Sequence, residues 1–230
     1  LNGVPIASLV DNGAERCHVS LRFAESHKLS PQDGTQHVVQ PGNGKTVLSP
    51  GIVSIPWQFS GESESYLIDC AIIPGCVRDL VLGANFLRLT QTLTKFKSRI
   101  TATARGVLRR LHLNLLGGEK QRLWRFLDDV LASALPDTGS DVMLVSEDYA
   151  RSRGLHVDRN PQHRLELELG DGTVTYTSGV VRHLVWSFGD SGEDVTSDFY
   201  VLPGMPADII LSNELLFELD VFSRFDEFLI

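Results

Sequence analysis

The feature that most constrains the fold is an internal repeat, in which residues 1–29 align with residues 127–155 without a gap. Ten of the 29 aligned positions are identical, whereas average residue usage would give about two. The identical pairs are Leu1/Leu127, Val4/Val130, Leu9/Leu135, Asp11/Asp137, Gly13/Gly139, Val19/Val145, Ser20/Ser146, Ala24/Ala150, Ser26/Ser152 and Leu29/Leu155. The offset of 126 residues is far above the roughly 20–50 residues of solenoid repeats, so each unit should be a small domain of its own.

The similarity continues through both units after small insertions. At an offset of 128 residues, Gly44 matches Gly172 and Gly51 matches Gly179. At an offset of 129 the matching pairs are Trp57/Trp186, Phe59/Phe188, Asp69/Asp198, Pro74/Pro203, Gly75/Gly204, Asp79/Asp208, Leu82/Leu211, Leu87/Leu216 and Phe96/Phe225. The sequence therefore predicts a duplicated chain with lobes at 1–100 and 127–230, joined by a linker at 101–126.

The pattern within each unit is mostly that of β-strands. Apolar runs follow turn signals, and residues 165–169 alternate with period two before the turn Gly170-Asp171-Gly172. Ser20 and Ser146 are placed to cap short helices. The expected strands are 4–10, 79–82, 130–135, 165–169 and 208–211, and the expected helices are 21–29, 84–89, 147–155 and 213–219. The fold class is thus all-β, with two barrels and one or two short helices in each lobe.

Charge is distributed unevenly along the chain, whose formal net charge is -8. Residues 101–126 carry six basic side chains against one acidic, and residues 127–230 carry six against twenty. The acidic lobe would repel phosphate, so no nucleic-acid partner is expected despite the basic linker. With leucines interspersed among its arginines, the linker is expected to be partly helical with solvated basic side chains.

Hydropathy and cysteine content restrict whether the chain crosses a membrane and in which kind of compartment it is located. No apolar stretch approaches the roughly 20 residues of a membrane span, so no membrane partner is expected. The first residues contain neither Met nor a signal region and read as part of a longer protein. Cys17, Cys70 and Cys76 form an odd set without a CxxC pair, which favours a reducing, cytoplasmic location. Cys17 and His18 lack the further ligands of a structural zinc site.

The candidate chemistry lies in two Asp-x-Gly loops, Asp11-Asn12-Gly13 and Asp137-Thr138-Gly139, each of which ends an apolar strand. The segment Ala134-Leu-Pro-Asp-Thr-Gly-Ser-Asp141 resembles the signature of retropepsin-type aspartic proteases, and Leu80-Val-Leu-Gly83 resembles their hydrophobic-hydrophobic-Gly motif. Retroelement and cellular retropepsins supply one such domain per chain and dimerise. The resemblance implies two tandem acid-protease barrels in one chain, arranged about a pseudo-twofold axis.

Hydrolysis of a peptide bond by water needs two carboxyl groups with different protonation. One carboxylate takes a proton from water while a carboxylic acid hydrogen-bonds the carbonyl oxygen of the scissile bond. Two carboxyls about 3 Å apart cannot both ionise, so they share a proton and titrate as a pair. The resemblance assigns these roles to Asp11 and Asp137, one from each unit, without dividing base and acid between them.

The residues around the two aspartates should support their approach. Gly13 and Gly139 permit a tight turn, and the hydroxyl of Thr138 can hydrogen-bond across to the other loop. Asn12 lacks that hydroxyl, although its amide can also bridge. Two further departures from the family pattern are Pro136, which removes a backbone donor, and Ser212, which stands where the first unit has Gly83 and would crowd the packing behind the loop.

Four residues are implied to bind substrate. Glu15 and Asp141 align with the acidic position that contacts the substrate backbone in the family. Gly44 and Gly172 lie in hairpins that resemble the family's flaps, whose closure excludes water from a bound peptide.

The leading hypothesis is a single-chain aspartic endopeptidase that acts on a peptide or protein substrate and uses no metal or organic cofactor. The alternative is a catalytically impaired relative that binds peptides or a partner protein, which Asn12, Pro136 and Ser212 permit. The presence of both Asp11 and Asp137 favours catalysis. The chain would be a monomer with an internal pseudo-dimer; in a homodimer, each lobe would instead pair with its counterpart in a second chain.

Overall fold

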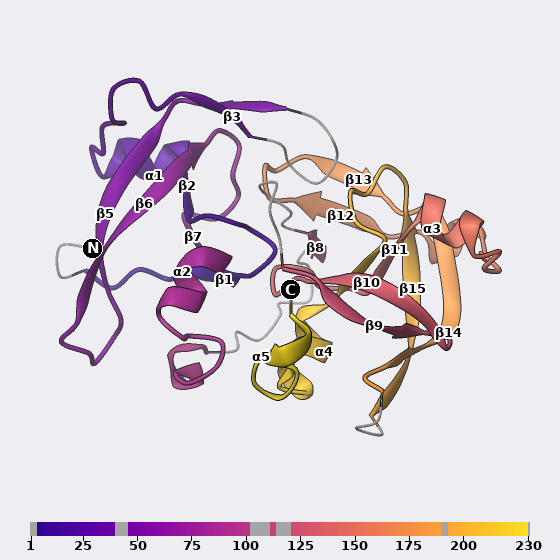
Figure 1. Cartoon of the computed structure of the whole chain (residues 1–230). Coiled ribbons are helices and arrows are strands. Elements are labelled where there is room, and N and C mark those ends of the chain that lie inside the picture. Colours follow the sequence, from indigo (N-terminus) through magenta and orange to yellow (C-terminus); the bar gives the residue numbers. More distant parts are fainter. Residues whose placement is uncertain (1–3, 40–45, 102–110, 114–120, 190–192, 230) are drawn as a thin grey trace.

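The computed structural model describes residues 4–39, 46–101, 111–113, 121–189 and 193–229, which are mostly β-structure with short helices (Figure 1). The strands of the first half are β1 (Leu9–Asp11), β2 (His18–Ser20), β3 (His37–Val39), β4 (Val47–Ser49), β5 (Ile52–Gln58), β6 (Ser65–Ile73) and β7 (Leu80–Gly83). The later strands are β8 (Leu111–Leu113), β9 (Leu123–Leu127), β10 (Val130–Pro136), β11 (Leu144–Ser146), β12 (Glu166–Leu169), β13 (Val174–Tyr176), β14 (Gly179–Ser187), β15 (Asp194–Leu202) and β16 (Ile209–Leu211). The α-helices are α1 (Leu21–Ser26), α2 (Ala84–Leu89), α3 (Glu147–Ser152), α4 (Asn213–Glu218) and α5 (Val221–Arg224).

The strands of the two halves form separate sheets. In the first half, five strands are ordered β1-β7-β2-β6-β5, and β3 pairs with β4. In the second half, six strands close into a barrel in the order β10-β16-β11-β15-β14-β9, and a three-stranded sheet is ordered β13-β12-β8. The two groups lie side by side, with the barrel at the right in Figure 1.

The strand pairings of the two halves correspond at the offsets of the sequence repeat. In the first half β1 runs parallel to β7, with Leu9 opposite Val81, and in the second half β10 runs parallel to β16, with Leu135 opposite Ile210. The pairs β2·β7, β2·β6 and β5·β6 have the counterparts β11·β16, β11·β15 and β14·β15 in equivalent registers. A bulge between Val181 and Leu184 adds one residue to β14, which explains why the offset grows from 128 to 129.

The first half differs from the expected closed barrel, because its described strands form an open five-stranded sheet. The strand expected at 4–10 is also shorter, since β1 covers only Leu9–Asp11. In the second half the antiparallel strand β9 pairs with β10 over Val130–Ala134. Within the described part of the first half, residues 4–8 are not paired with a strand equivalent to β9.

The linker also differs from the expected partly helical segment at the positions that the structure describes. Leu111–Leu113 forms β8, which pairs in parallel with β12, and Leu123–Leu127 forms β9 of the barrel. The alternation of Leu and His in β8 fits a strand with one buried face. The second folded unit therefore begins at Leu123, before the expected boundary at residue 127; residues 102–110 and 114–120 lie outside the described residues.

Local signals predicted where the short helices begin, but α1 and α3 end at Ser26 and Ser152, three residues before the expected ends at Leu29 and Leu155. The hydroxyl of Ser20 accepts a hydrogen bond from Phe23 N at 3.0 Å, and that of Ser146 accepts one from Tyr149 N at 3.0 Å. Both serines are therefore N-caps, as expected. Each cap follows directly on a buried strand, so it turns the chain from the sheet into the helix.

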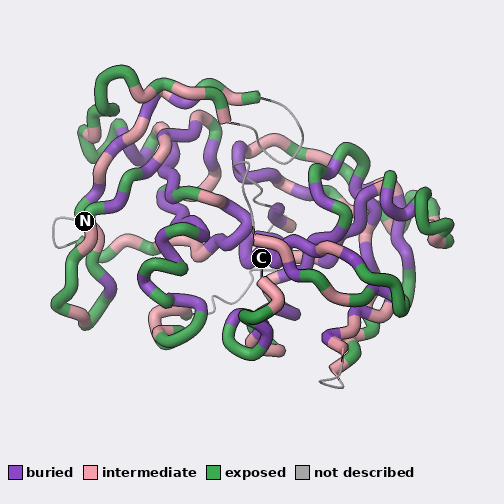
Figure 2. The backbone as a smooth tube through the Cα atoms, viewed as in Figure 1, coloured by how far each residue is buried: buried purple, intermediate pink, exposed green. Residues whose placement is uncertain are grey.

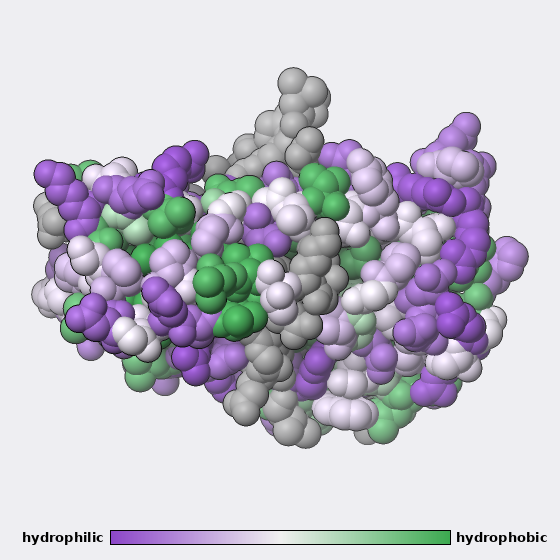
Figure 3. Space-filling view, turned by 90° about the horizontal axis from the view of Figure 1, so that it is seen from above, coloured by the Kyte–Doolittle hydropathy of each residue, from purple (hydrophilic) through white to green (hydrophobic). Residues whose placement is uncertain are grey.

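The main core cluster contains apolar side chains of both halves, and two smaller clusters are separate from it. Figure 2 shows how the buried residues are distributed along the backbone. Trp186 is completely buried in it, whereas its counterpart Trp57 is only partly buried. Cys17, Cys70 and Cys76 are free and buried. Seen from above, apolar side chains gather near the middle of the molecule, and hydrophilic ones prevail towards its ends (Figure 3).

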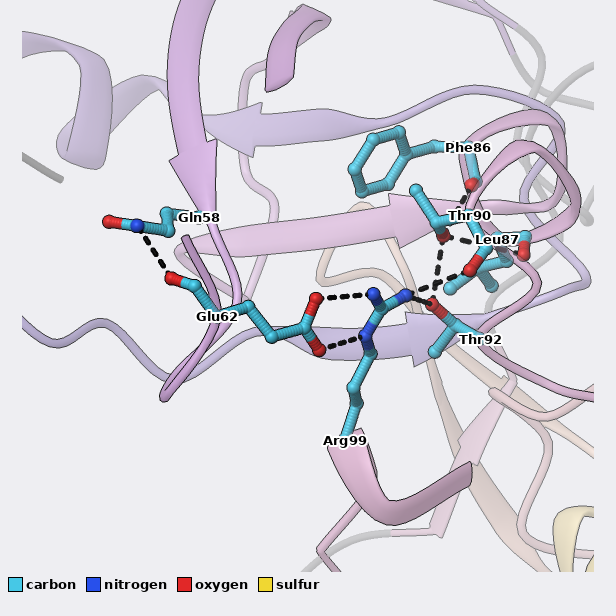
Figure 4. A network of polar contacts seen from close by, with 7 residues as sticks. All are labelled: Gln58, Glu62, Phe86, Leu87, Thr90, Thr92 and Arg99. Carbon is cyan, nitrogen blue, oxygen red and sulfur yellow. Dashed lines mark hydrogen bonds and ion pairs between the residues drawn. The ribbon is translucent and has the colours of Figure 1, made fainter. Parts of the chain in front are cut away.

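A network around Arg99 fastens the segment after α2 to the first half (Figure 4). Its guanidinium forms a two-pronged ion pair with Glu62, and Nη1 donates to Thr90 O at 2.8 Å. The same group stacks on the rings of Phe59 and Phe96, at 3.9 and 4.3 Å from their centroids. The hydrogen bonds from Arg99 hold the pKa of the Glu62 carboxyl below its usual value. This network is structural, since each of its polar groups is used to hold the segment.

Candidate active site

The two Asp-x-Gly loops begin at the ends of β1 and β10, on the sides of the two halves that face each other (Figure 1). Each preceding strand is hydrogen-bonded to a parallel neighbour, β7 or β16, which fixes where the loop starts. Asp11 and Asp137 are completely buried. Burying a carboxyl group costs free energy unless the group is hydrogen-bonded or paired. Two fully buried aspartates therefore mark the candidate site.

Each aspartate is held by the backbone of its own loop. Asp11 Oδ1 accepts hydrogen bonds from Gly13 N at 2.8 Å and Ala14 N at 3.2 Å. Asp137 Oδ1 accepts one from Gly139 N at 2.8 Å. These short-range bonds are typical of Asp in a tight turn, and they set the direction of both carboxyl groups.

The two loops are joined to each other by hydrogen bonds. Thr138 Oγ1 accepts from Asn12 N at 2.8 Å and donates to Val10 O at 3.1 Å. In the other direction, the side-chain amide of Asn12 donates to Pro136 O at 3.3 Å. One hydroxyl and one amide therefore bridge the loops, and Pro136, although it lacks an N–H, takes part through its carbonyl.

The carboxyl of Asp137 lies directly against Gly13 of the first loop. A Cβ atom at position 13 would lie 2.3 Å from Asp137 Oδ1 and 2.4 Å from its Cγ, so no larger residue fits there. Gly13 N also donates to Asp11, so both carboxyl groups adjoin this one glycine. The structure thus brings together six of the expected site residues: Asp11, Asn12, Gly13, Asp137, Thr138 and Gly139.

The loops are braced from behind by the strand-to-helix turns at Gly83 and Ser212. Gly83 N donates to Cys17 Sγ at 3.4 Å, and at the equivalent place Ser212 N donates to Met143 Sδ at 3.2 Å. A Cβ at Gly83 would lie 2.4 Å from the backbone of Arg16, so the first half requires glycine. In the second half Asn213 N still bonds Ser140 O at 2.9 Å, so the brace forms in spite of Ser212.

Glu15 and Asp141, the two expected substrate contacts, have different surroundings. Glu15 pairs with its neighbour Arg16 at 3.3 Å. Asp141 Oδ2 accepts from His112 N at 2.9 Å, and Asp141 N donates to His112 O at 3.0 Å. Asn213 Nδ2 also donates to Asp141 Oδ1, at 3.2 Å. Asp141 therefore binds the backbone of another segment of the same chain, at His112. The sequence interpretation missed His112 because it treated the linker as partly helical.

Of the two flap-like hairpins, the structure describes the tip of the second. Gly172, at the turn between β12 and β13, lies against the first half: a Cβ there would be 2.6 Å from Gly75 O. Asp171 is buried and accepts from Thr173 N and Oγ1 at 3.0 and 2.7 Å, which shapes the turn. Gly44, the expected counterpart, lies outside the described residues.

The turn that meets this hairpin contains Cys76, which the sequence interpretation did not place near the site. Burial, together with the negative charges of Asp11, Asp79 and Asp171, raises the pKa of the Cys76 thiol to about 12. A thiol that stays protonated at neutral pH is a poor nucleophile, so the residues that offer reactive chemistry here are the aspartates.

His18, the first residue of β2, should make the stability of the fold depend on pH. Burial lowers the pKa of His18 to about 4, against an ordinary value of 6.5. Between these values the unfolded chain binds a proton that the folded chain does not, so the free energy of unfolding should fall by roughly 3 kcal/mol as the pH drops from 7 to 4. Replacing His18 with Leu, the residue at equivalent position 144, should remove this loss, as measured by urea unfolding at both pH values.

The matched control is His163→Leu, which changes a histidine outside the core. In His163→Leu the unfolding free energy should still fall between pH 7 and pH 4, and it should fall by more than in His18→Leu. An equal difference in wild type and His18→Leu would contradict the assignment of acid sensitivity to His18.

Among the described residues, no cluster of three or more His, Cys, Asp or Glu side chains is arranged to hold a metal ion. The same part of the chain contains no helix with the length and apolar character needed to cross a bilayer.

Of the comparisons with known proteins, the match to a family model agrees with the motif in the first loop. Residues 1–86 match the family model described as Aspartyl protease. A solved structure, the retroviral protease-like domain of Ddi1 from Leishmania major, is similar over 43% of this chain and 75% of that chain, at 15% identity and a TM-score of 0.31. Comparison with curated proteins gave no match. The family match and the mostly β architecture support a retropepsin-like fold.

Proposed function

We propose that the chain is an aspartic endopeptidase in which Asp11 and Asp137 activate one water molecule. The observation that carries this proposal is that two buried carboxyls, from loops 126 residues apart, adjoin the same residue, Gly13. The bridges made by Thr138 and Asn12 hold the loops together. We expect the two carboxyls to share a hydrogen bond or one water.

The chemistry follows from the shared proton of such a pair. Two adjoining carboxyls cannot both be ionised, so one is a carboxylate and the other an acid. The carboxylate takes a proton from water as the water oxygen bonds to the peptide carbonyl carbon, and the acid gives its proton to the carbonyl oxygen, on which negative charge would otherwise develop. The newly formed acid then protonates the amide nitrogen as the C–N bond breaks, and the other carboxylate takes a proton back from a hydroxyl of the intermediate, which restores one carboxylate and one acid. No group outside the chain is needed for these transfers.

The proposal includes a tandem origin and a pseudo-twofold relation between the lobes at 1–100 and 127–230. Its support is the correspondence of strand registers in the two halves and the single added residue at the β14 bulge. Because the loops are bridged within one chain, the proposal pairs the lobes in a monomer. A homodimer would require these bridges to form between chains.

A second candidate function, peptide binding without cleavage, is favoured by one asymmetry. The bridge from Thr138 uses a hydroxyl that both accepts and donates, whereas the bridge from Asn12 uses a longer amide contact of 3.3 Å. Because the longer contact is the one that Asn12 makes to Pro136 of the second loop, that loop would be held less tightly and would place Asp137 less accurately. Catalytic geometry is sensitive to such displacements.

The experiment is to incubate the purified protein with a diverse peptide mixture from about pH 3 to 7, a range that brackets the titration of coupled carboxyls. Cleavage should fall on both the acid and the alkaline side, because one carboxyl must be ionised and the other protonated. Circular dichroism at each pH separates loss of activity from acid unfolding. No cleavage at any pH by folded protein would favour the binding function.

A further inference from the structure

The strand β8 forms a third strand beside the hairpin β12·β13. It lies beside β12 in parallel, with Leu111 opposite Leu167, His112 opposite Glu168 and Leu113 opposite Leu169. In the first half, the corresponding hairpin β3·β4 has two strands among the residues described. The six-stranded barrel closes without β8, so the strand is not required for barrel closure.

The backbone of β8 is held by the loop that carries Asp137. His112 N donates to Asp141 Oδ2 and His112 O accepts from Asp141 N, at 2.9 and 3.0 Å. This pair of bonds recognises a peptide backbone in extended form and requires only that the bound residue has an N–H. On the other edge of β8, the backbone of β12 pairs with it as a neighbouring parallel strand. Addition of a strand to such an edge is a common way to bind a peptide.

The side chains of β8 fill an apolar site that is separate from the main core. Leu113 is completely buried and Leu111 partly buried. They belong to a cluster that includes Leu135, Leu144, Leu167, Leu169, Leu202, Met205, Ala207 and Ile210. His112 Nδ1 lies 3.6 Å from Glu168 Oε2, on an acidic half of the chain. The imidazole of His112 thus adjoins a carboxyl of the strand with which β8 pairs.

We propose that β8 occupies a peptide-binding subsite beside the Asp137 loop, as an internal ligand that competes with other peptides. The ligand class is an extended peptide with leucines two residues apart, its backbone held by Asp141 and its second leucine buried. The inference deepens the proposed function, since the subsite adjoins the proposed catalytic loop, but peptide binding is measurable whether or not the chain cleaves peptides.

The test uses a fluorescent peptide with the sequence of residues 108–116, in an Asp11→Asn background so that cleavage cannot consume it. His112→Pro removes the N–H that Asp141 accepts and should release β8. Because a tethered ligand acts at an effective concentration in the millimolar range, the variant should bind the peptide at least about tenfold more tightly, measured by fluorescence polarisation. The matched control His112→Ala keeps the N–H and should bind as weakly as the parent.

Two further measurements complete the test. Adding Asp141→Ala to His112→Pro should abolish the gain. If His112→Pro does not fold, saturating peptide added to the parent should increase hydrogen exchange at residues 111–113. A folded His112→Pro that binds no more tightly than His112→Ala, or exchange that peptide leaves unchanged, would overturn the inference. Binding without cleavage by the wild type would contradict only the proposed function, and cleavage without a gain in binding would contradict only this inference.

Discussion

Asparagine in place of either Asp11 or Asp137 is expected to reduce peptide cleavage by about 10³-fold or more, because each substitution leaves one carboxyl to act as both base and acid. Asparagine keeps the size of the side chain, and its carbonyl oxygen can still accept the hydrogen bond from Gly13 N or Gly139 N. The loops should therefore keep their shape. The measurement is kcat/KM on a cleaved peptide, with thermal unfolding recorded for each variant.

The matched control is Asp129→Asn, the same chemical change at an exposed position in the turn between β9 and β10. It should leave kcat/KM within about twofold of wild type, as surface substitutions usually have small effects. Cleavage that survives in either Asp11→Asn or Asp137→Asn would show that another group activates the water.

Loss of the Thr138 hydroxyl is expected to have the next largest effect. Thr138→Val keeps the shape of the side chain but leaves Asn12 N without its acceptor and Val10 O without its donor. An unsatisfied buried group costs about 1–3 kcal/mol, and the bond to Val10 O is only partly buried, so this second loss should cost less and the free energy of unfolding should fall by roughly 2–4 kcal/mol in all. Cleavage should fall as well, because the loops that carry the two aspartates are no longer joined on this side.

Thr138→Ser is the matched control, since it keeps the hydroxyl, and it should lose much less stability and activity. Asn12→Thr tests the same contact from the other loop and should maintain or raise activity by introducing a hydroxyl there. If urea unfolding and kcat/KM cannot distinguish Thr138→Val from Thr138→Ser, the inter-loop hydrogen bonds do not stabilise the site.

The repeat made much of the fold predictable from the sequence. Matching positions such as Leu9 and Leu135 lie at equivalent registers in parallel strand pairs, because identities spaced along an apolar strand preserve the face that is buried. The caps at Ser20 and Ser146 were predictable for a local reason, since the hydroxyl that starts each helix and the amide it accepts from are three residues apart. The bridge between loops could be foreseen from the hydroxyl of Thr138 once the loops were paired.

The features that the sequence did not reveal depend on distant partners. Leu111–Leu113 becomes a strand because the edge of β12, more than fifty residues later, receives it; with arginines before it, the same segment also fits a solvated helix. Among the described residues, the pairing that β9 gives to β10 has no equivalent beside residues 4–8, and the sheet of the first half is open. The contact of Asp141 with His112 and the position of Cys76 likewise follow from tertiary arrangement.

The most direct test of the central claim, that one chain supplies both aspartates to one site, is the activity of an equimolar mixture of Asp11→Asn and Asp137→Asn. If the loops pair within a chain, as the bridges from Thr138 and Asn12 support, every site in the mixture lacks one carboxyl. Cleavage should then stay at the sum of the two separate variants while wild type cleaves the same peptide. Recovery of cleavage well above that sum would show that Asp11 of one chain pairs with Asp137 of another, and cleavage by either variant alone would be the sign of pairing between like lobes; both results would contradict the account.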